Sequence, residues 1–137
     1  MNNFKNEWAI LHGDIEKYER FSLIIKLFSV LISGLCAAYY VAAWFSVVLI
    51  FVLWLQDGIW KTFQKRIEAR ILFIETALRT NEDENSEAFQ FYSQWEDNRK
   101  GVIGLVKEYL SNSAKPTVAY PYVVLVLLQL VYHYFVI

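Results

Sequence analysis

The sequence predicts an all-α integral membrane protein with three spans: a two-span helical hairpin, a C-terminal third span, and a small cytoplasmic helical layer. The 137 residues are 56% hydrophobic, and the apolar residues gather in two runs, residues 21–60 and 117–137. A transmembrane helix needs about 20 mostly apolar residues, which both runs supply. Between positions 21 and 55 the one formally charged side chain is Lys26, and there is no proline.

The first run is too long for one span. A helix over residues 21–55 would be about 52 Å long, whereas the hydrocarbon core of a bilayer is roughly 30 Å thick. Its middle is small and aromatic, and Tyr39, Tyr40 and Trp44 are typical of a membrane interface. These features predict a tight hairpin over residues 21–60 that leaves and re-enters the same side of the bilayer.

Residues 1–20 read as an amphipathic cytoplasmic helix. Trp8, Leu11, Ile15 and Tyr18 recur at helical spacing. Packing against other cytoplasmic elements is favoured over a lipid-surface helix, because the polar face carries both signs of charge. A cleavable signal peptide is not expected, since no small-residue cleavage site follows a short apolar segment.

The first span is expected at about residues 21–38. Lys26 lies about one and a half turns inside it, so its stem is expected to snorkel towards the head groups. Ser29, Ser33 and Gly34 belong to stripes of small residues that permit close helix contact. The partner is either the second helix of the hairpin or another copy of the chain. Cys36 has no partner for an internal disulfide and is expected to be a small packing residue.

The second span is expected at about residues 42–60, and Asp57 marks the depth where it emerges. Trp54 and Trp60 bracket this carboxylate as interface aromatics. Asp57 and Lys61 are four residues apart, which predicts a local ion pair.

A long amphipathic helix follows over residues 59–79. Only Gly58 interrupts the helical pattern between it and the second span, so one helix is expected to continue about 30 Å into the cytoplasm. Its apolar positions have nearly coiled-coil spacing. They are Trp60, Phe63, Ile67, Ile71, Ile74 and Leu78. Packing against the N-terminal helix is favoured over a self-assembly stalk.

The rest of the cytoplasmic region, residues 61–116, carries shorter elements. Residues 80–87 predict a solvated acidic link whose carboxylates lack calcium-loop spacing. Residues 88–100 predict an aromatic-rich helix used for packing rather than for stacking on nucleic-acid bases. Residues 102–110 predict a short helix with Ile103 on its apolar side, together with Val106 and Leu110.

The third span is expected at residues 117–137. Pro121 falls in its first turns, where proline costs least. Tyr120 and Tyr122 are expected at the cytoplasmic interface. Gln129 lies towards the far half and can form a hydrogen bond between helices, worth roughly 0.6–2 kcal/mol.

Positive charges predict the orientation of the chain. The hairpin turn has no Lys or Arg, whereas the segments on both sides of the hairpin have several. The positive-inside rule therefore places the N-terminus and residues 61–116 in the cytoplasm and the C-terminus on the extracytoplasmic side.

Catalytic and ligand-binding motifs are missing from the sequence. It contains no glycine-rich phosphate loop, nucleophile elbow or zinc-protease motif. His12 and His133 are predicted on opposite sides of the membrane, so they cannot share a metal or a triad. The net charge of −1 gives no basic field for nucleic acid. We therefore expect no enzyme activity, cofactor, metal or nucleic-acid binding.

Two segments carry a resemblance to known proteins. VLIFVLWLQDGIWKTFQKRIEARILFIE, followed later by LSNSAKPTVAYPY, resembles small bacterial inner-membrane proteins with three spans. The layout of helix, hairpin and long cytoplasmic helix is similar to that of SLATT-type membrane effectors of bacterial conflict systems. The resemblance implies residence in the bacterial inner (cytoplasmic) membrane, and pore formation or membrane disruption once a partner signals.

The favoured hypothesis is a small oligomeric membrane effector that alters permeability in a defence system when triggered. Its partners would be the lipid bilayer, further copies of the chain and a soluble cytoplasmic sensor. Sparse polarity favours a hydrophobic gate over a constitutive aqueous pore. The candidate pore, gating or interface residues are Ser29, Ser33, Gly34, Ser46, Gln56, Asp57, Gly58 and Gln129. The alternative is a non-conducting anchor or immunity-type protein that recruits or inhibits a soluble partner.

Overall fold

The computed structural model describes residues 2–80, 89–90, 93, 96 and 101–136. These residues form helices and no strand. The helices are α1 (Asn2–Ala38), α2 (Ala43–Thr80), α5 (Val102–Ser113) and α6 (Pro116–Val136). The acidic link and the aromatic helix that the sequence predicts over 80–100 fall largely outside the described residues.

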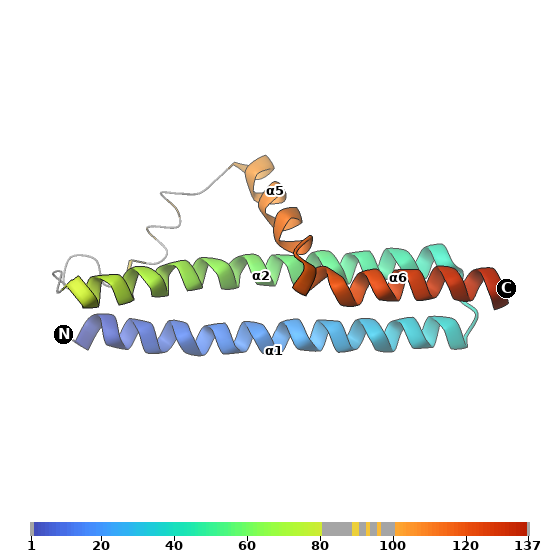
Figure 1. Ribbon diagram of the computed structural model, residues 1–137, viewed down its shortest axis with the longest axis horizontal. Coiled ribbons are helices and arrows are strands. Elements are labelled where there is room, and N and C mark those ends of the chain that lie inside the picture. Colours follow the sequence, from blue (N-terminus) through green and yellow to red (C-terminus); the bar gives the residue numbers. More distant parts are fainter. Residues whose placement is uncertain (1, 81–88, 91–92, 94–95, 97–100, 137) are drawn as a thin grey trace.

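Helices α1 and α2 form a long antiparallel hairpin (Figure 1). α1 joins the predicted N-terminal helix to the first apolar run without a break, and α2 joins the second run to the amphipathic helix. With 37 and 38 residues, each helix is about 55 Å long at 1.5 Å per residue. In the turn, Tyr40 takes the left-handed conformation with φ of 54°, and Val41 N–H bonds Cys36 O at 2.9 Å.

The hairpin has an apolar half, residues 21–60, and a polar half, residues 2–20 and 61–80, which we term the extension. The predicted apolar seam of α2 packs against α1 of the same chain in the extension, as the favoured reading of the sequence expected. The buried residues of this contact are Phe4 and Leu11 of α1 and Ile67, Ile71, Ile74 and Ala77 of α2. This contact encloses the extension's own small core.

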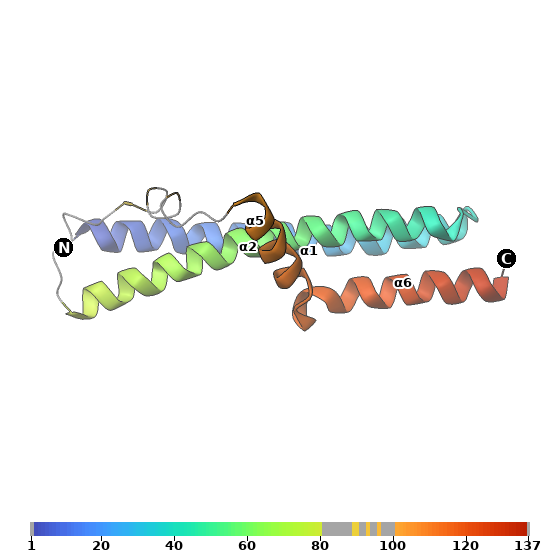
Figure 2. The same cartoon turned by 90° about the horizontal axis from the view of Figure 1, so that it is seen from above.

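Helix α6 lies beside the apolar half, with its C-terminus near the hairpin turn (Figure 1). Ile50 of α2 and Leu125 of α6 form a buried cluster there together with Tyr122. Helix α5 crosses α2 steeply and joins α6 through a two-residue turn, Ala114 and Lys115 (Figures 1 and 2). The predicted short helix thus continues to Ser113 before the chain turns.

Three helices of the described chain, α1, α2 and α6, are long and apolar enough to cross a membrane. Their large apolar side chains are mainly exposed, for example Leu27 at 61%, Val52 at 58% and Leu128 at 58%. Such a surface fits hydrocarbon rather than water, because a chain of this size does not leave so many large apolar groups hydrated. The structure therefore has the features of a multi-pass membrane protein.

Candidate functional site

Asp57 of α2 is fully buried between three helices. Its carboxylate accepts a hydrogen bond from Ser22 Oγ of α1 and one from the Tyr122 hydroxyl of α6 at 2.9 Å. Lys26 Nζ of α1 lies 3.7 Å from its Oδ2. A buried carboxylate is tolerated only when it is paired and hydrogen-bonded, and here one group joins α1, α2 and α6. We call these four residues the charged layer.

Two sequence predictions near Asp57 are corrected. Lys26 reaches inward to Asp57 instead of snorkelling, because the two side chains lie opposite each other in the hairpin. Lys61 pairs with Glu19 at 2.8 Å and not with Asp57. Tyr122, which the sequence predicts at the membrane interface, is buried between the helices with its ring against Trp54.

The Lys61–Glu19 pair closes the hairpin just outside the apolar half. Gln64 Nε2 donates to the same Glu19 oxygen at 2.8 Å. The Lys61 ammonium, followed by the Gln64 amide, lowers the pKa of Glu19, because both hydrogen bonds favour the ionised carboxylate. Ionic contacts therefore lie on both sides of the boundary between the apolar half and the extension.

Gly58 is a packing position within α2. α2 continues through it without interruption. A Cβ at this site would lie 1.7 Å from Ser113 Oγ and 3.3 Å from Tyr109 O of α5. Only glycine permits this approach, so Gly58 allows α5 to sit directly on α2 next to Asp57.

Two hydrogen bonds fix the end of α5 on either side of Gly58. Trp54 Nε1 donates to Ser113 O at 2.8 Å, and Asn112 Nδ2 donates to Thr62 Oγ1 at 2.8 Å. Thr62 and Asn112 are both buried. α5 thus contacts α2 one turn before and one turn after the charged layer.

A second polar layer lies nearer the hairpin turn, and we call it the hydroxyl layer. Gln129 Nε2 of α6 donates to Ser33 O of α1 at 2.7 Å, a bond of the kind predicted for Gln129. Ser33 and Ser46 each lie eleven residues closer to the turn than Ser22 and Asp57, so the antiparallel register puts them at one level. Both hydroxyls are buried without a hydrogen-bond partner in the described chain.

An apolar layer separates the two polar layers. Ile50 is fully buried and Leu125 is 8% exposed, and they pack together between Asp57 and Ser46 along α2. Ser29 lies at this level on α1, where its hydroxyl donates to Ile25 O of its own helix at 2.8 Å and also contacts the Tyr122 hydroxyl of α6. The charged, apolar and hydroxyl layers together form what we call the polar seam.

The other predicted positions lie away from the seam. Gly34 and Gln56 are exposed, and no atom lies within 4 Å of where a Gly34 Cβ would be. Trp60 packs at the boundary against Tyr18 and Phe21, with ring centroids at 5.2 and 5.5 Å. These three positions do not contribute to the buried polar contacts.

Sequence reasoning missed part of the seam and of the extension. Tyr122 and Gln129 are seven residues apart and therefore share a face of α6. Because Gln129 was predicted to face another helix, this spacing could have predicted that Tyr122 is buried as well. Arg70, expected outside the apolar seam of α2, is buried in an ion pair with Glu7, with Nε–Oε1 of 2.7 Å. No local sequence pattern predicts this ion pair, because its two residues are 63 positions apart in the chain.

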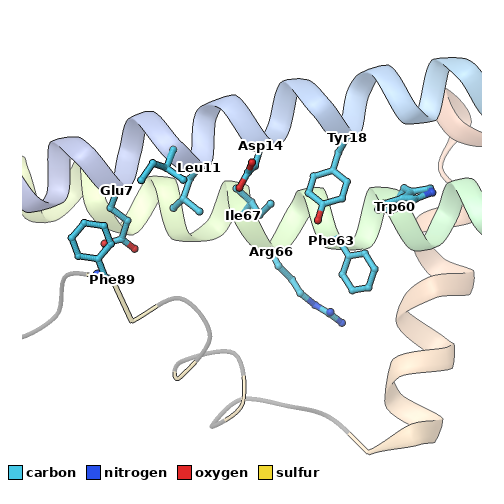
Figure 3. Close-up of a pocket in the computed structure, with 10 residues that line it drawn as sticks. Glu7, Leu11, Asp14, Tyr18, Trp60, Phe63, Arg66, Ile67 and Phe89 are labelled. Atoms are coloured by element: carbon cyan, nitrogen blue, oxygen red, sulfur yellow. The ribbon is translucent and has the colours of Figure 1, made fainter.

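The extension carries a pocket of about 420 Å³, and Glu7, the partner of Arg70, is one of its lining residues (Figure 3). Tyr18, Phe63 and Ile67 give it a mainly apolar lining, and Asp14 and Arg66 add charges. The backbone N–H of Phe89 donates to Glu7 Oε2 at one end of it. Among the described residues, no three His, Cys, Asp or Glu side chains gather where they could hold a metal ion.

Comparison of the chain with protein-family models, curated proteins and solved structures finds no match.

Proposed function

We propose that the apolar half and α6 are inserted in the bacterial cytoplasmic membrane, and that the chain is a membrane effector that alters permeability. The observation that carries the proposal is the polar seam. Two buried polar layers, one of them charged, lie along the axis of the three apolar helices and are interrupted by one apolar layer. The SLATT-like layout supports a role in conflict or defence.

The outer surface of the apolar helices offers no comparable path. Ser22, Ser29, Ser33 and Ser46 are all buried, while the exposed positions between them are mainly Leu, Ile, Val and Phe. Polar groups in a bilayer are costly unless they face protein or a hydrated cavity. A hydrophobic constriction between polar regions blocks ions by excluding water. These contacts support the proposal of a closed state in which Ile50 and Leu125 form the gate.

Opening requires α6 to move relative to the hairpin. In the described part of the chain, the hydrogen bonds that tie α6 to α1 and α2 include Tyr122–Asp57, Gln129–Ser33 O and Tyr132–Ala37 O. Displacement of α6 would separate Leu125 from Ile50 and hydrate the layers on both sides. Three helices enclose little space, so we propose that several copies of the chain line the open path.

The gate is tested by making the apolar layer polar. Ile50→Ser should raise ion flux through phosphatidylethanolamine–phosphatidylglycerol vesicles, because water can then bridge the two polar layers. Val52→Ser, at a lipid-facing position of the same helix, is the matched control and should leave flux low. In cells, Ile50→Ser should cause dye entry. If Ile50→Ser is inserted and folded yet flux stays at the level of Val52→Ser, the gate proposal fails.

The pocket of the extension favours a second candidate, a non-conducting anchor that binds a soluble partner. Its apolar lining with charges at the rim resembles a protein-binding surface more than a solvated helix face. Ile10→Asp, at an exposed position of the pocket lining, would then abolish capture of the partner. No flux in any variant, together with partner binding that depends on Ile10, would favour the anchor over the effector.

A further inference from the structure

Helix α5 has an apolar face that no described residue covers. Val102, Ile103, Val106 and Leu110 are 75%, 86%, 49% and 53% exposed. The last three recur at spacings of 3 and 4, so they share one side of the helix. The opposite side is the one that contacts α2, through Asn112 and its neighbours.

α5 contacts α2 at the level where the apolar half ends. Its contacts to α2 begin at Trp54 and extend to Arg66, which lies 3.4 Å from Glu108. The apolar run of α2 ends in this interval, and its first basic residue is Lys61. Since aromatic and basic residues mark a bilayer boundary, α5 lies at the boundary of the proposed membrane.

The direction of α5 also fits this boundary. It runs steeply across the hairpin axis, whereas α1, α2 and α6 run along it (Figures 1 and 2). Only Ala114 and Lys115 separate its last residue from the first residue of α6. Because α6 must enter the bilayer at Pro116, the C-terminal end of α5 cannot lie far from the lipid surface.

We infer that α5 is an interfacial helix. Its apolar face, formed by Ile103, Val106 and Leu110, inserts between lipid head groups. An amphipathic helix in the membrane plane buries its apolar face at the boundary of head groups and acyl chains. The flanking Lys107 and Lys115 are exposed and can contact anionic head groups. This inference rests on the proposed insertion of the three spans, and it assigns the lipid surface as the partner of this face.

The test uses single cysteines carrying an environment-sensitive fluorophore in the full chain, with Cys36→Ala as background. The protein is placed in phosphatidylethanolamine–phosphatidylglycerol nanodiscs. Ile103→Cys reports on α5, Leu128→Cys is the lipid reference, and Glu68→Cys is the water reference. The label at 103 should be quenched by spin-labelled lipid, as at 128, and should be less accessible to iodide than at 68.

Each failure has a separate signature. If the label at 128 escapes the lipid quencher, insertion itself fails, and the proposed function fails with it. If the label at position 128 is quenched by lipid but the label at position 103 behaves like the one at position 68, the membrane insertion stands and only the assignment of α5 as an interfacial helix is overturned. A label at 103 shielded from both quenchers would mean that protein covers the face, from this chain or from a second copy, and would also overturn the inference.

Discussion

Asp57 has partners on two other helices, so its replacement should affect the whole apolar bundle. Asp57→Ala leaves the Lys26 ammonium and the hydroxyls of Ser22 and Tyr122 without their acceptor. We expect the free energy of unfolding to fall by about 3–5 kcal/mol, the range for breaking a buried ion pair by removing one partner. Denaturation in detergent, followed by circular dichroism, measures the loss.

The matched experiment is a double-mutant cycle with Lys26→Met. If Lys26 and Asp57 interact, Lys26→Met should cost less in the Asp57→Ala background than in the native chain. Simple additivity of the two changes would show that the pair contributes no coupling to stability.

Gly58 and Gly13 both lie within helices, but we expect substitution by alanine to have opposite effects on protein stability at the two positions. Gly58→Ala forces a Cβ against Ser113 and should destabilise the protein by about 1–3 kcal/mol. Gly13→Ala meets no atom within 4 Å and should stabilise by about 0.5–1 kcal/mol through helix propensity. Thermal unfolding of the two variants gives the sign of each change.

The contact itself is tested by adding Ser113→Gly to Gly58→Ala. This removes the two closest atoms, so stability should largely return. Failure of the second change to restore any stability would mean that Gly58 matters for a reason other than the approach of α5.

At single positions, the sequence predicted that Asp57 matters but assigned it the wrong partner. A spacing of four residues on one helix made Lys61 the nearest cation. The actual cation, Lys26, is 31 positions earlier and reaches Asp57 only because the turn at Tyr40 sets the register of the hairpin. Contacts between helices depend on that register, which periodicity within one helix does not encode.

Between elements, the Lys61–Glu19 contact of α2 and α1 gives a prediction about pH. The pKa of Glu19 is lowered from its ordinary value of 4.5, so the folded chain binds this proton less readily than the unfolded one. Glu19 therefore contributes stability above pH 4.5, and the contribution disappears as pH falls through the lowered pKa. Lys61→Met should move the pKa of Glu19 back up, as read by NMR titration of its side chain.

Lys65→Met is the control for that titration, since Lys65 is exposed on the same helix. It should leave the pKa of Glu19 in place. An equal response to both substitutions would indicate a general charge effect rather than the specific contact.

The long elements were predictable because their signals are local. A long apolar run with few charges and no proline sets the apolar half, and the continuity of α2 past Gly58 follows from a helical period that resumes directly after this glycine. The position of α5 was not predictable, because it depends on Gly58 and Ser113, two small residues of different elements that meet in space. Small residues at such contacts carry no distinctive pattern in one sequence.

For the whole molecule, the hairpin predicts which positions share a side of the membrane. The hairpin turn and the C-terminal end of α6 lie at one end of the structure, and the extension lies at the other (Figure 1). Ala42 belongs to the turn, His133 to the last turn of α6, and Glu68 to the part of α2 in the extension. In spheroplasts of a Cys36→Ala background, an impermeant maleimide should label Ala42→Cys and His133→Cys directly. Glu68→Cys should react only after lysis, as the positive-inside rule requires.

Labelling of Glu68→Cys alone in intact spheroplasts would mean that the chain is inserted in the opposite orientation. Labelling of all three positions would contradict the spans themselves.

The charged layer also has a consequence for how the chain is made. Ser22 and Lys26 leave the ribosome before Asp57, whereas Tyr122 follows it by 65 residues. At about 5–20 residues per second, the hairpin waits roughly 3–13 s for its third helix. During that time α1 alone supplies the cation and one hydroxyl that compensate Asp57. If the hairpin is inserted as proposed, the carboxylate can enter lipid already paired, and α6 then docks onto a hairpin in which this charge is balanced.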